Sequence, residues 1–189
     1  ALGDHYERIG EVQIACREYA SLALSEHGDE MYAAVGEPGL ERLTRREASL
    51  RIADARRDLS ETDQSELDAY FREHYLEPAI AERDRTQLRR LAETPSCGAV
   101  AGEAELTLGK WMAIASRFEQ AEAHLMRLIR VNPEDVLTAE ATGWLAAMYL
   151  FPGDFHLPIQ ASALLNRLER RYRDVELPAS IVRLHVMAT

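Results

Sequence analysis

The chain has 189 residues, of which 47% are apolar and 29% are charged, a balance typical of folded proteins and too apolar for a disordered one. Its formal net charge is −10 at pH 7, which argues against general binding to a nucleic-acid backbone, because that affinity comes mainly from lysine and arginine. Glycine and proline are sparse and no stretch shows the sustained alternation of a strand, so the composition predicts an all-α protein.

Only two cysteines are present, Cys16 and Cys97, and neither lies in a C-x-x-C motif. This number excludes a scaffold of several disulfides, and the spacing offers no zinc site; whether the two are paired stays open. No segment resembles a signal peptide or an apolar membrane span of about 18 residues. Both chain ends interrupt helical patterns, at Ala1 and at Thr189, so we expect the sequence to be part of a longer protein.

Residues 1–28 predict a pair of helices. The first begins near Gly3, and Gly10 makes the turn into the second. Apolar residues then recur at helical spacing along the second helix, at Ala15, Tyr19 and Leu22. Such a stripe is expected to pack against the preceding helix.

Residues 29–100 are less regular and predict divergent helical repeats. The apolar spacing indicates helices over residues 31–35, 40–59, 61–75 and 77–91. Ser60 is expected to cap the third of these, because a serine is followed there by acidic residues of a first turn. Residues 94–98, which contain Pro95 and Gly98, are the best linker candidate in the chain.

The second half of the chain repeats itself. Residues 120–128 read Q-A-E-A-H-L-M-R-L and residues 160–168 read Q-A-S-A-L-L-N-R-L, identical at six of nine positions at an offset of 40. The preceding helices, residues 108–113 and 145–150, align at an offset of 37. The three extra residues fall in the loop over residues 151–158. Two constant helices with a loop of variable length are typical of stacked helix pairs.

The spacing within the first of these pairs predicts how its helices pack. Leu108, Trp111 and Met112 form one stripe at i, i+3 and i+4, and Gly109 leaves room for a close crossing. The facing stripe consists of Ala121, Leu125 and Leu128. We expect the small Ala121 to lie opposite Gly109. The corresponding packing positions of the next pair are Leu145, Ala161 and Leu165.

One spacing occurs in both halves of the chain. Gly3 and Ala15 are twelve residues apart, as are Gly109 and Ala121, and Pro133 follows after twelve more. At these positions the chain resembles the tetratricopeptide repeat (TPR), with L-G-x-x-[YM], then A, L, L and a final proline. The repeat length, which drifts between 34 and 40 residues, resembles the Sel1-like branch of that family.

This resemblance implies an α/α superhelical solenoid of antiparallel helix pairs. Residues 1–28 would be one pair, residues 29–100 divergent repeats, residues 101–173 two further pairs, and residues 174–189 the first helix of another. In TPR arrays partners usually lie along the concave face built by the first helix of each pair. The residues that the resemblance places there are Asp4, Glu7, Arg8, Leu106, Lys110 and Ile114, and Trp144 is a candidate aromatic in the same groove.

Residues 104–189 also resemble the Sel1/TPR-type lipoproteins of the bacterial alginate export apparatus. The stretches that carry this resemblance are L-G-K-W-M-A, M-Y-L-F-P and E-L-P-A-S-I-V-R-L-H-V-M. It implies a periplasmic scaffold at the outer membrane whose partners are an export porin and polysaccharide-modifying enzymes. Membrane attachment would come only through a lipid anchor or a partner outside this chain.

Motifs for catalysis were absent from the sequence. It contains no G-x-x-x-x-G-K-[ST], G-x-G-x-x-G, H-E-x-x-H or G-x-S-x-G, and its six histidines lack ligand spacing. We therefore expect no catalytic residue, metal or cofactor, and predict a non-catalytic scaffold for protein–protein interaction. Two alternatives stay open: a cytoplasmic TPR adaptor or regulator, and an all-α enzyme whose site carries no recognisable motif.

Overall fold

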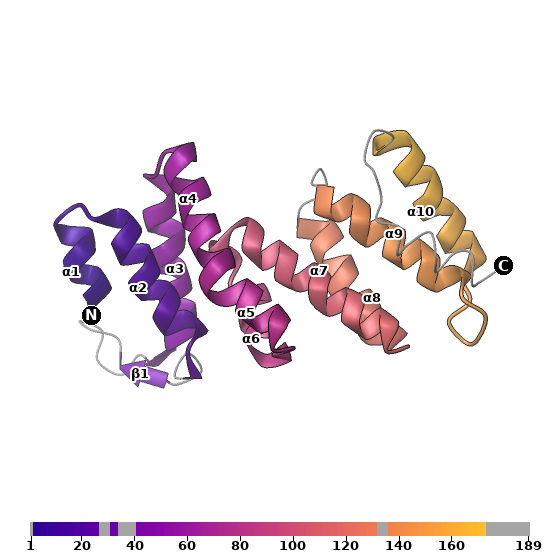
Figure 1. The fold of residues 1–189 in the computed structure, drawn as a ribbon, viewed down its shortest axis with the longest axis horizontal. Coiled ribbons are helices and arrows are strands. Elements are labelled where there is room, and N and C mark those ends of the chain that lie inside the picture. The colour runs from indigo at the N-terminus through magenta and orange to yellow at the C-terminus, as the bar shows by residue number, and fades with distance from the viewer. Residues whose placement is uncertain (1, 27–30, 34–40, 132–135, 173–189) are drawn as a thin grey trace. The chain divides into compact units, whose positions relative to one another are not determined.

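The computed structural model describes residues 2–26, 31–33, 41–131 and 136–172. They form helices joined by short turns, together with one two-stranded hairpin (Figure 1). The predicted helical class is therefore confirmed. The chain divides into two compact units, Ala1–Ala104 and Glu105–Thr189, and the boundary falls inside one helix. The segments predicted at residues 132–133 and 174–189 lie outside the described residues.

The first unit contains most of the elements. They are α1 (Leu2–Arg8), α2 (Val12–Leu24), β1 (Met31–Ala33), β2 (Glu41–Leu43), α3 (Thr44–Arg57), α4 (Glu61–Phe71), the π-helical turn η2 (Arg72–Leu76), α5 (Glu77–Ala81), α6 (Arg85–Ala92), the 3-10 turn η3 (Pro95–Cys97) and the first part of α7 (Ala99–Ile114).

The predicted N-terminal helix pair is confirmed as α1 and α2. Gly10 joins them with a φ of 84°, a conformation that glycine adopts without strain. Gly3 lies directly against the ring of Tyr19, because a Cβ built on Gly3 would be 2.5 Å from Tyr19 Cε1. Tyr19 is only 4% exposed and Ala15 is fully buried. The pair is thus closed by the aromatic ring of Tyr19, a residue of the predicted stripe, packed on Gly3.

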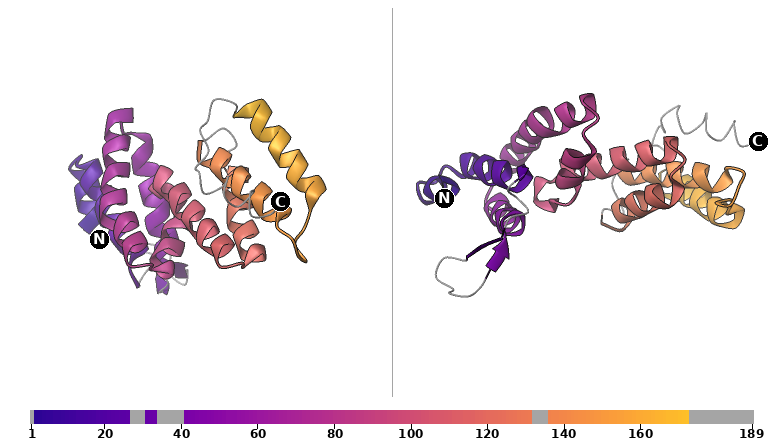
Figure 2. Two further views of the ribbon diagram at one scale, coloured as in Figure 1. Left: turned by 45° about the vertical axis from the view of Figure 1, so that its right-hand side comes forward. Right: turned by 90° about the horizontal axis from the view of Figure 1, so that it is seen from below.

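Two paired strands correct the predictions for residues 31–33 and 41–43, while residues 34–40 lie outside the described residues. Helix was predicted over residues 31–35 and from residue 40, but β1 and β2 pair antiparallel with Met31 opposite Leu43. Figure 2 shows the strands at the N-terminal end of α3, whose first residue follows β2 directly. An apolar run of five residues does not distinguish a helix from a strand by its spacing, so the cross-strand hydrogen bonds decided between them.

A continuous helical segment runs from α4 through η2 into α5, where two separate helices were predicted. The predicted cap at its start is confirmed, since Ser60 Oγ accepts a hydrogen bond from the Asp63 backbone N–H at 3.2 Å. The π-helical turn ends at Leu76, two residues before Pro78, which lacks an N–H and would clash with a carbonyl in a regular helix. The segment ends at Ala81. Arg83 in the following turn has a φ of 56°, and Asp84 caps α6.

Residues 94–98 do not form an exposed linker. Thr94 and Cys97 are fully buried, Ser96 is 8% exposed, and the Ser96 hydroxyl lies 2.9 Å from the Ser49 hydroxyl in α3. Gly98 follows with a φ of 65°, a backbone conformation that glycine adopts without strain. Proline and glycine here make a packed turn, which composition alone does not distinguish from a flexible connection.

The two cysteines are buried free thiols. Burial raises the pKa of Cys16 to about 11 and the pKa of Cys97 to about 12, because a thiolate is poorly solvated in an apolar interior. An unfolded chain exposes both thiols and loses their protons at lower pH than the folded chain. Their contribution to stability is therefore complete below the unfolded pKa, near 9.0, and decreases as the pH rises through the folded values.

We accordingly predict alkaline destabilisation that depends on these thiols. Above pH 9, each thiol should lower the free energy of unfolding by up to about 1.4 kcal/mol per pH unit until its folded pKa is reached. Urea unfolding followed by circular dichroism at pH 7.5 to 11 measures this slope. Cys97→Ala should show a shallower slope than the wild type, and an unchanged slope would contradict the assignment.

The second unit consists of the rest of α7 with α8 (Phe118–Val131), α9 (Val136–Leu150) and α10 (Pro158–Arg171). These confirm the helices predicted from the internal repeat. Its core takes residues from all four helices, including Met112, Leu125, Leu145 and Ala161. Gly109 is close to Leu125, since an added Cβ would lie 2.7 Å from Leu125 Cδ2. The nearest residue is therefore Leu125, and the prediction that Ala121 lies opposite Gly109 is wrong, although Ala121 is fully buried.

The prediction for Leu165 is also wrong. This side chain is 44% exposed, whereas Ala161, Leu164 and Leu168 turn toward the interior of the unit. The inward stripe of α10 therefore runs at i, i+3 and i+7, while that of α8 runs at i, i+4 and i+7. A shift of one residue turns a side chain by about 100° around the helix axis, so sequence identity at this position did not preserve its face.

Candidate functional site

Three of the residues predicted to contact a partner lie together in the first unit. Asp4, Glu7 and Arg8 of α1 line an open cavity of about 410 Å³, together with Arg51 of α3. Arg51 was not among the predicted contact residues, because it belongs to a segment without a visible repeat. The cavity is open to solvent and carries both signs of charge.

The carboxylates of this cavity are held by Tyr19. Its hydroxyl donates toward Asp4 Oδ1 at 2.7 Å and toward Glu7 Oε2 at 3.0 Å. Burial, reinforced by these hydrogen bonds, raises the pKa of Tyr19 above its usual range. Arg51 Nη1 is 4.0 Å from Glu7 Oε2. The acidic groups at this cavity therefore already have partners within the chain.

The predicted partner residues of the second unit separate into exposed and buried ones. Ile114 is 67% exposed, and Lys110 Nζ donates to Glu140 Oε1 of α9 at 2.7 Å. Leu106 and Trp144, in contrast, are only 4% and 2% exposed and belong to the core. Their assignment to a binding groove is wrong, because helix periodicity does not tell which apolar side of a helix the next pair will cover.

A buried carboxylate joins α7 to α8. Glu105 is 3% exposed, and its Oε1 lies 3.1 Å from His124 Nδ1 and 3.4 Å from Arg127 Nε. His124, whose side chain is 19% exposed, is therefore packed against this carboxylate. Among the described residues, no group of three or more His, Cys, Asp or Glu side chains could hold a metal ion.

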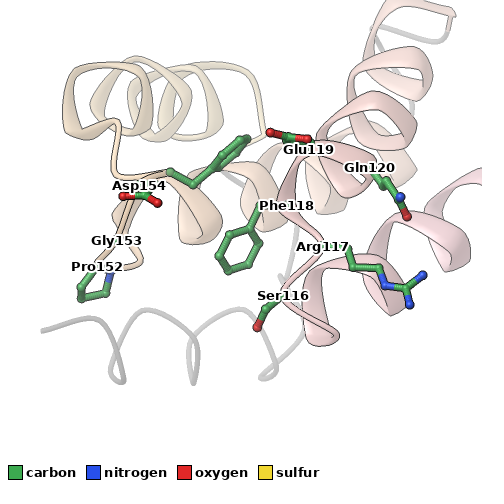
Figure 3. Close-up of a pocket in the computed structure, with 9 residues that line it drawn as sticks. Ser116, Arg117, Phe118, Glu119, Gln120, Pro152, Gly153 and Asp154 are labelled. Atoms are coloured by element: carbon green, nitrogen blue, oxygen red, sulfur yellow. The ribbon is translucent and has the colours of Figure 1, made fainter.

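The second unit also contains a cavity that the sequence analysis did not predict. It has a volume of about 440 Å³ and lies between the turn after α7 and the loop after α9 (Figure 3). Its lining residues are Ser116, Arg117, Phe118, Glu119, Gln120, Pro152, Gly153, Asp154 and Phe155. Part of this wall belongs to residues 151–158, the loop that is three residues longer than its counterpart. That insertion was the only sequence signal for the cavity.

Aromatic rings hold the longer loop against the neighbouring turn. Phe118 contacts Phe151 and Phe155, with ring centroids 5.5 and 5.7 Å apart, and Phe155 contacts Tyr149 at 5.8 Å. The Leu157 N–H donates to the Tyr149 carbonyl at 2.8 Å, and the Tyr149 hydroxyl donates to Glu122. Burial, followed by that hydrogen bond, raises the pKa of Tyr149 above its usual range. These contacts pack the loop against the rest of the second unit.

Comparisons with known proteins returned no match: no family model, no curated protein and no solved structure corresponds to this chain. Within the described ranges, no helix combines the length and the apolar character that crossing a membrane requires.

Proposed function

We propose that the chain is a non-catalytic scaffold of TPR/Sel1-type helix pairs that holds other proteins. One observation carries this proposal. Gly3 packs against Tyr19 and Gly109 packs against Leu125, and in both pairs the glycine precedes the large residue by sixteen positions. The same close contact at the same spacing, in segments about a hundred residues apart, is what repeated helix pairs of one type produce.

The surface of the helix pairs supports a binding role. Proteins built from stacked helix pairs present extended surfaces to their partners. In the second unit, Ile114 is 67% exposed near the end of α7, one turn beyond Lys110. Protein interfaces combine an apolar core with a polar rim, so Ile114 suits the core of a contact and Lys110 its rim. We therefore propose Lys110 and Ile114 as partner contacts, with Asp4, Glu7 and Arg8 as contacts of the first unit.

We further propose that the partners belong to an exopolysaccharide export complex in the periplasm. This rests on the resemblance of residues 104–189 to the lipoproteins of alginate export. The partners would be an outer-membrane porin and polysaccharide-modifying enzymes, and the chain would reach the membrane through them or through an anchor outside this sequence.

A pull-down tests both levels of the proposal. The full chain is used as bait on separated membrane, periplasmic and cytoplasmic fractions of the native host, and captured proteins are identified by mass spectrometry. Recovery of a porin or polysaccharide-modifying enzymes is expected. Recovery of cytoplasmic proteins alone would refute the export role and favour a cytoplasmic adaptor. Failure to capture any protein from any fraction would refute the scaffold itself.

Matched variants locate the contact. Ile114→Asp should reduce the captured partner at least tenfold, because an interfacial apolar anchor is replaced by a charge that loses its water on binding. Ile159→Asp makes the same change at a site that is 83% exposed in α10, and should leave capture unchanged. Equal capture by both variants would show that the partner contacts a different surface.

A further inference from the structure

The cavity between the two loops of the second unit has two acidic side chains in its lining, Glu119 and Asp154. Glu119 and Asp154 are exposed side chains at its edge, and within the described part of the chain neither makes a hydrogen bond or an ion pair. This differs from the cavity at α1, where Tyr19 binds both carboxylates. The two free carboxylates are therefore available to a bound group.

Aromatic rings lie next to these carboxylates. In Figure 3 Phe118 lies beneath Asp154 and Glu119. Phe155 lines the same cavity, and its ring centroid is 5.7 Å from that of Phe118. Both rings are half-buried, so each still presents part of its surface to the cavity. A cation placed over an aromatic face gains from the ring quadrupole as well as from a nearby carboxylate. The combination of rings and acids favours a ligand with an apolar stem and a positive head.

The charges around the cavity argue against an anionic ligand. Among the described residues that line it, Arg117 is the only basic one, and its side chain extends away from the space between Phe118 and Asp154 (Figure 3). An anion approaching the start of α8 would meet Glu119, which already occupies the first turn. The net charge of −10 on the whole chain also favours encounter with a basic partner.

We propose that this cavity binds an arginine side chain of a partner protein. This proposal rests on the scaffold function and names the chemistry of one contact. The arginine stem would lie along Phe118 and Phe155, and the guanidinium would bind the carboxylates of Asp154 and Glu119. A planar guanidinium both stacks on aromatic rings and donates in pairs to carboxylates, which a lysine ammonium cannot do.

A titration with short peptides tests this directly. The 15N-labelled full chain is titrated with acetyl-Gly-Arg-Gly-amide and followed by NMR, which detects millimolar binding. Parallel titrations use the same peptide with citrulline, which has the shape of arginine without its charge, and with glutamate. We expect the arginine peptide to shift the amides of residues 116–120 and 153–155, and the citrulline peptide to bind at least tenfold more weakly.

Two matched double variants control for general electrostatics. Glu119→Gln with Asp154→Asn should reduce arginine-peptide affinity at least tenfold. Glu61→Gln with Asp58→Asn removes the same charges from the first turn of α4 and the residues before it, and should preserve binding. Equal binding of citrulline, shifts scattered over the chain, or tighter binding of the glutamate peptide would each overturn the proposal.

The peptide titration and the pull-down can fail separately. The first case is that the Glu119→Gln, Asp154→Asn variant captures as much partner as the wild type and the arginine peptide does not bind. The proposed arginine site is then wrong, and the scaffold proposal stands. If the peptide binds at the pocket while no protein is captured from any fraction, the scaffold proposal is wrong and the arginine site stands.

Discussion

Gly98→Ala is expected to destabilise the first unit by about 3 kcal/mol. Gly98 has a φ of 65° and a ψ of −136°, a region that residues with a Cβ rarely adopt. An alanine Cβ there would lie 2.6 Å from both Arg56 Nη2 and Asp68 Oδ1. These two side chains form an ion pair at 2.8 Å, with only 13% and 20% of their surface exposed. The substitution therefore adds backbone strain and also forces apart a largely buried ion pair.

Gly10→Ala is the matched control for this prediction. Gly10 also has a positive φ, of 84°, but an added Cβ would meet nothing within 4 Å. Gly10→Ala should therefore lower the free energy of unfolding only by the cost of backbone strain, about 1 kcal/mol. Urea unfolding followed by far-UV circular dichroism measures both variants. Equal losses at the two glycines would show that the Arg56–Asp68 pair moves aside without cost.

Trp144→Ala is expected to lower the free energy of unfolding of the second unit by about 3 to 5 kcal/mol. Trp144 is 2% exposed and packs in the core with Leu106, Leu125 and Leu145. Removal of the indole leaves a cavity that four helices would have to collapse around, and protein interiors relax only partly. If Trp144 lay in a binding groove, its substitution would instead weaken partner binding and change the free energy of unfolding little.

Trp111→Ala is the control for Trp144→Ala. Trp111 is half-buried, so its truncation removes less buried surface and should cost less than half as much. Urea unfolding followed by far-UV circular dichroism compares the two variants with the wild type. If the Trp144→Ala chain is as stable as the wild type but captures less partner, Trp144 belongs to a binding groove and not to the core.

Local patterns were sufficient for much of the helical structure. Gly10 ended α1 because a turn between helices needs a positive φ, and Ser60 started α4 because its hydroxyl satisfies a backbone N–H of the first turn. The internal repeat located α8, α9 and α10 because apolar residues recur at the period of a helix. Such features depend on residues within a few positions of each other, which a single sequence contains.

The candidate site was harder to predict, since it depends on contacts between segments distant in sequence. Leu106 and Trp144 carry the same apolar periodicity as exposed groove residues, and only packing against neighbouring helices showed them to be core. The cavity beside Phe118 required two loops to approach each other. The three-residue insertion marked that loop, but its length did not indicate that aromatic rings would hold it against the neighbouring turn.

The sequence by itself determined the helical class, the internal repeat and the glycine positions that allow close helix contacts, because these follow from local propensity and periodicity. Only the tertiary structure decided that Met31–Ala33 pairs as a strand, that Gly109 packs on Leu125, and that Tyr19 binds the carboxylates of Asp4 and Glu7. Strand pairing, close contact and hydrogen bonds between side chains join residues that are far apart in the chain. These interactions form only in the folded chain, so the spacing of residues in the sequence does not show them.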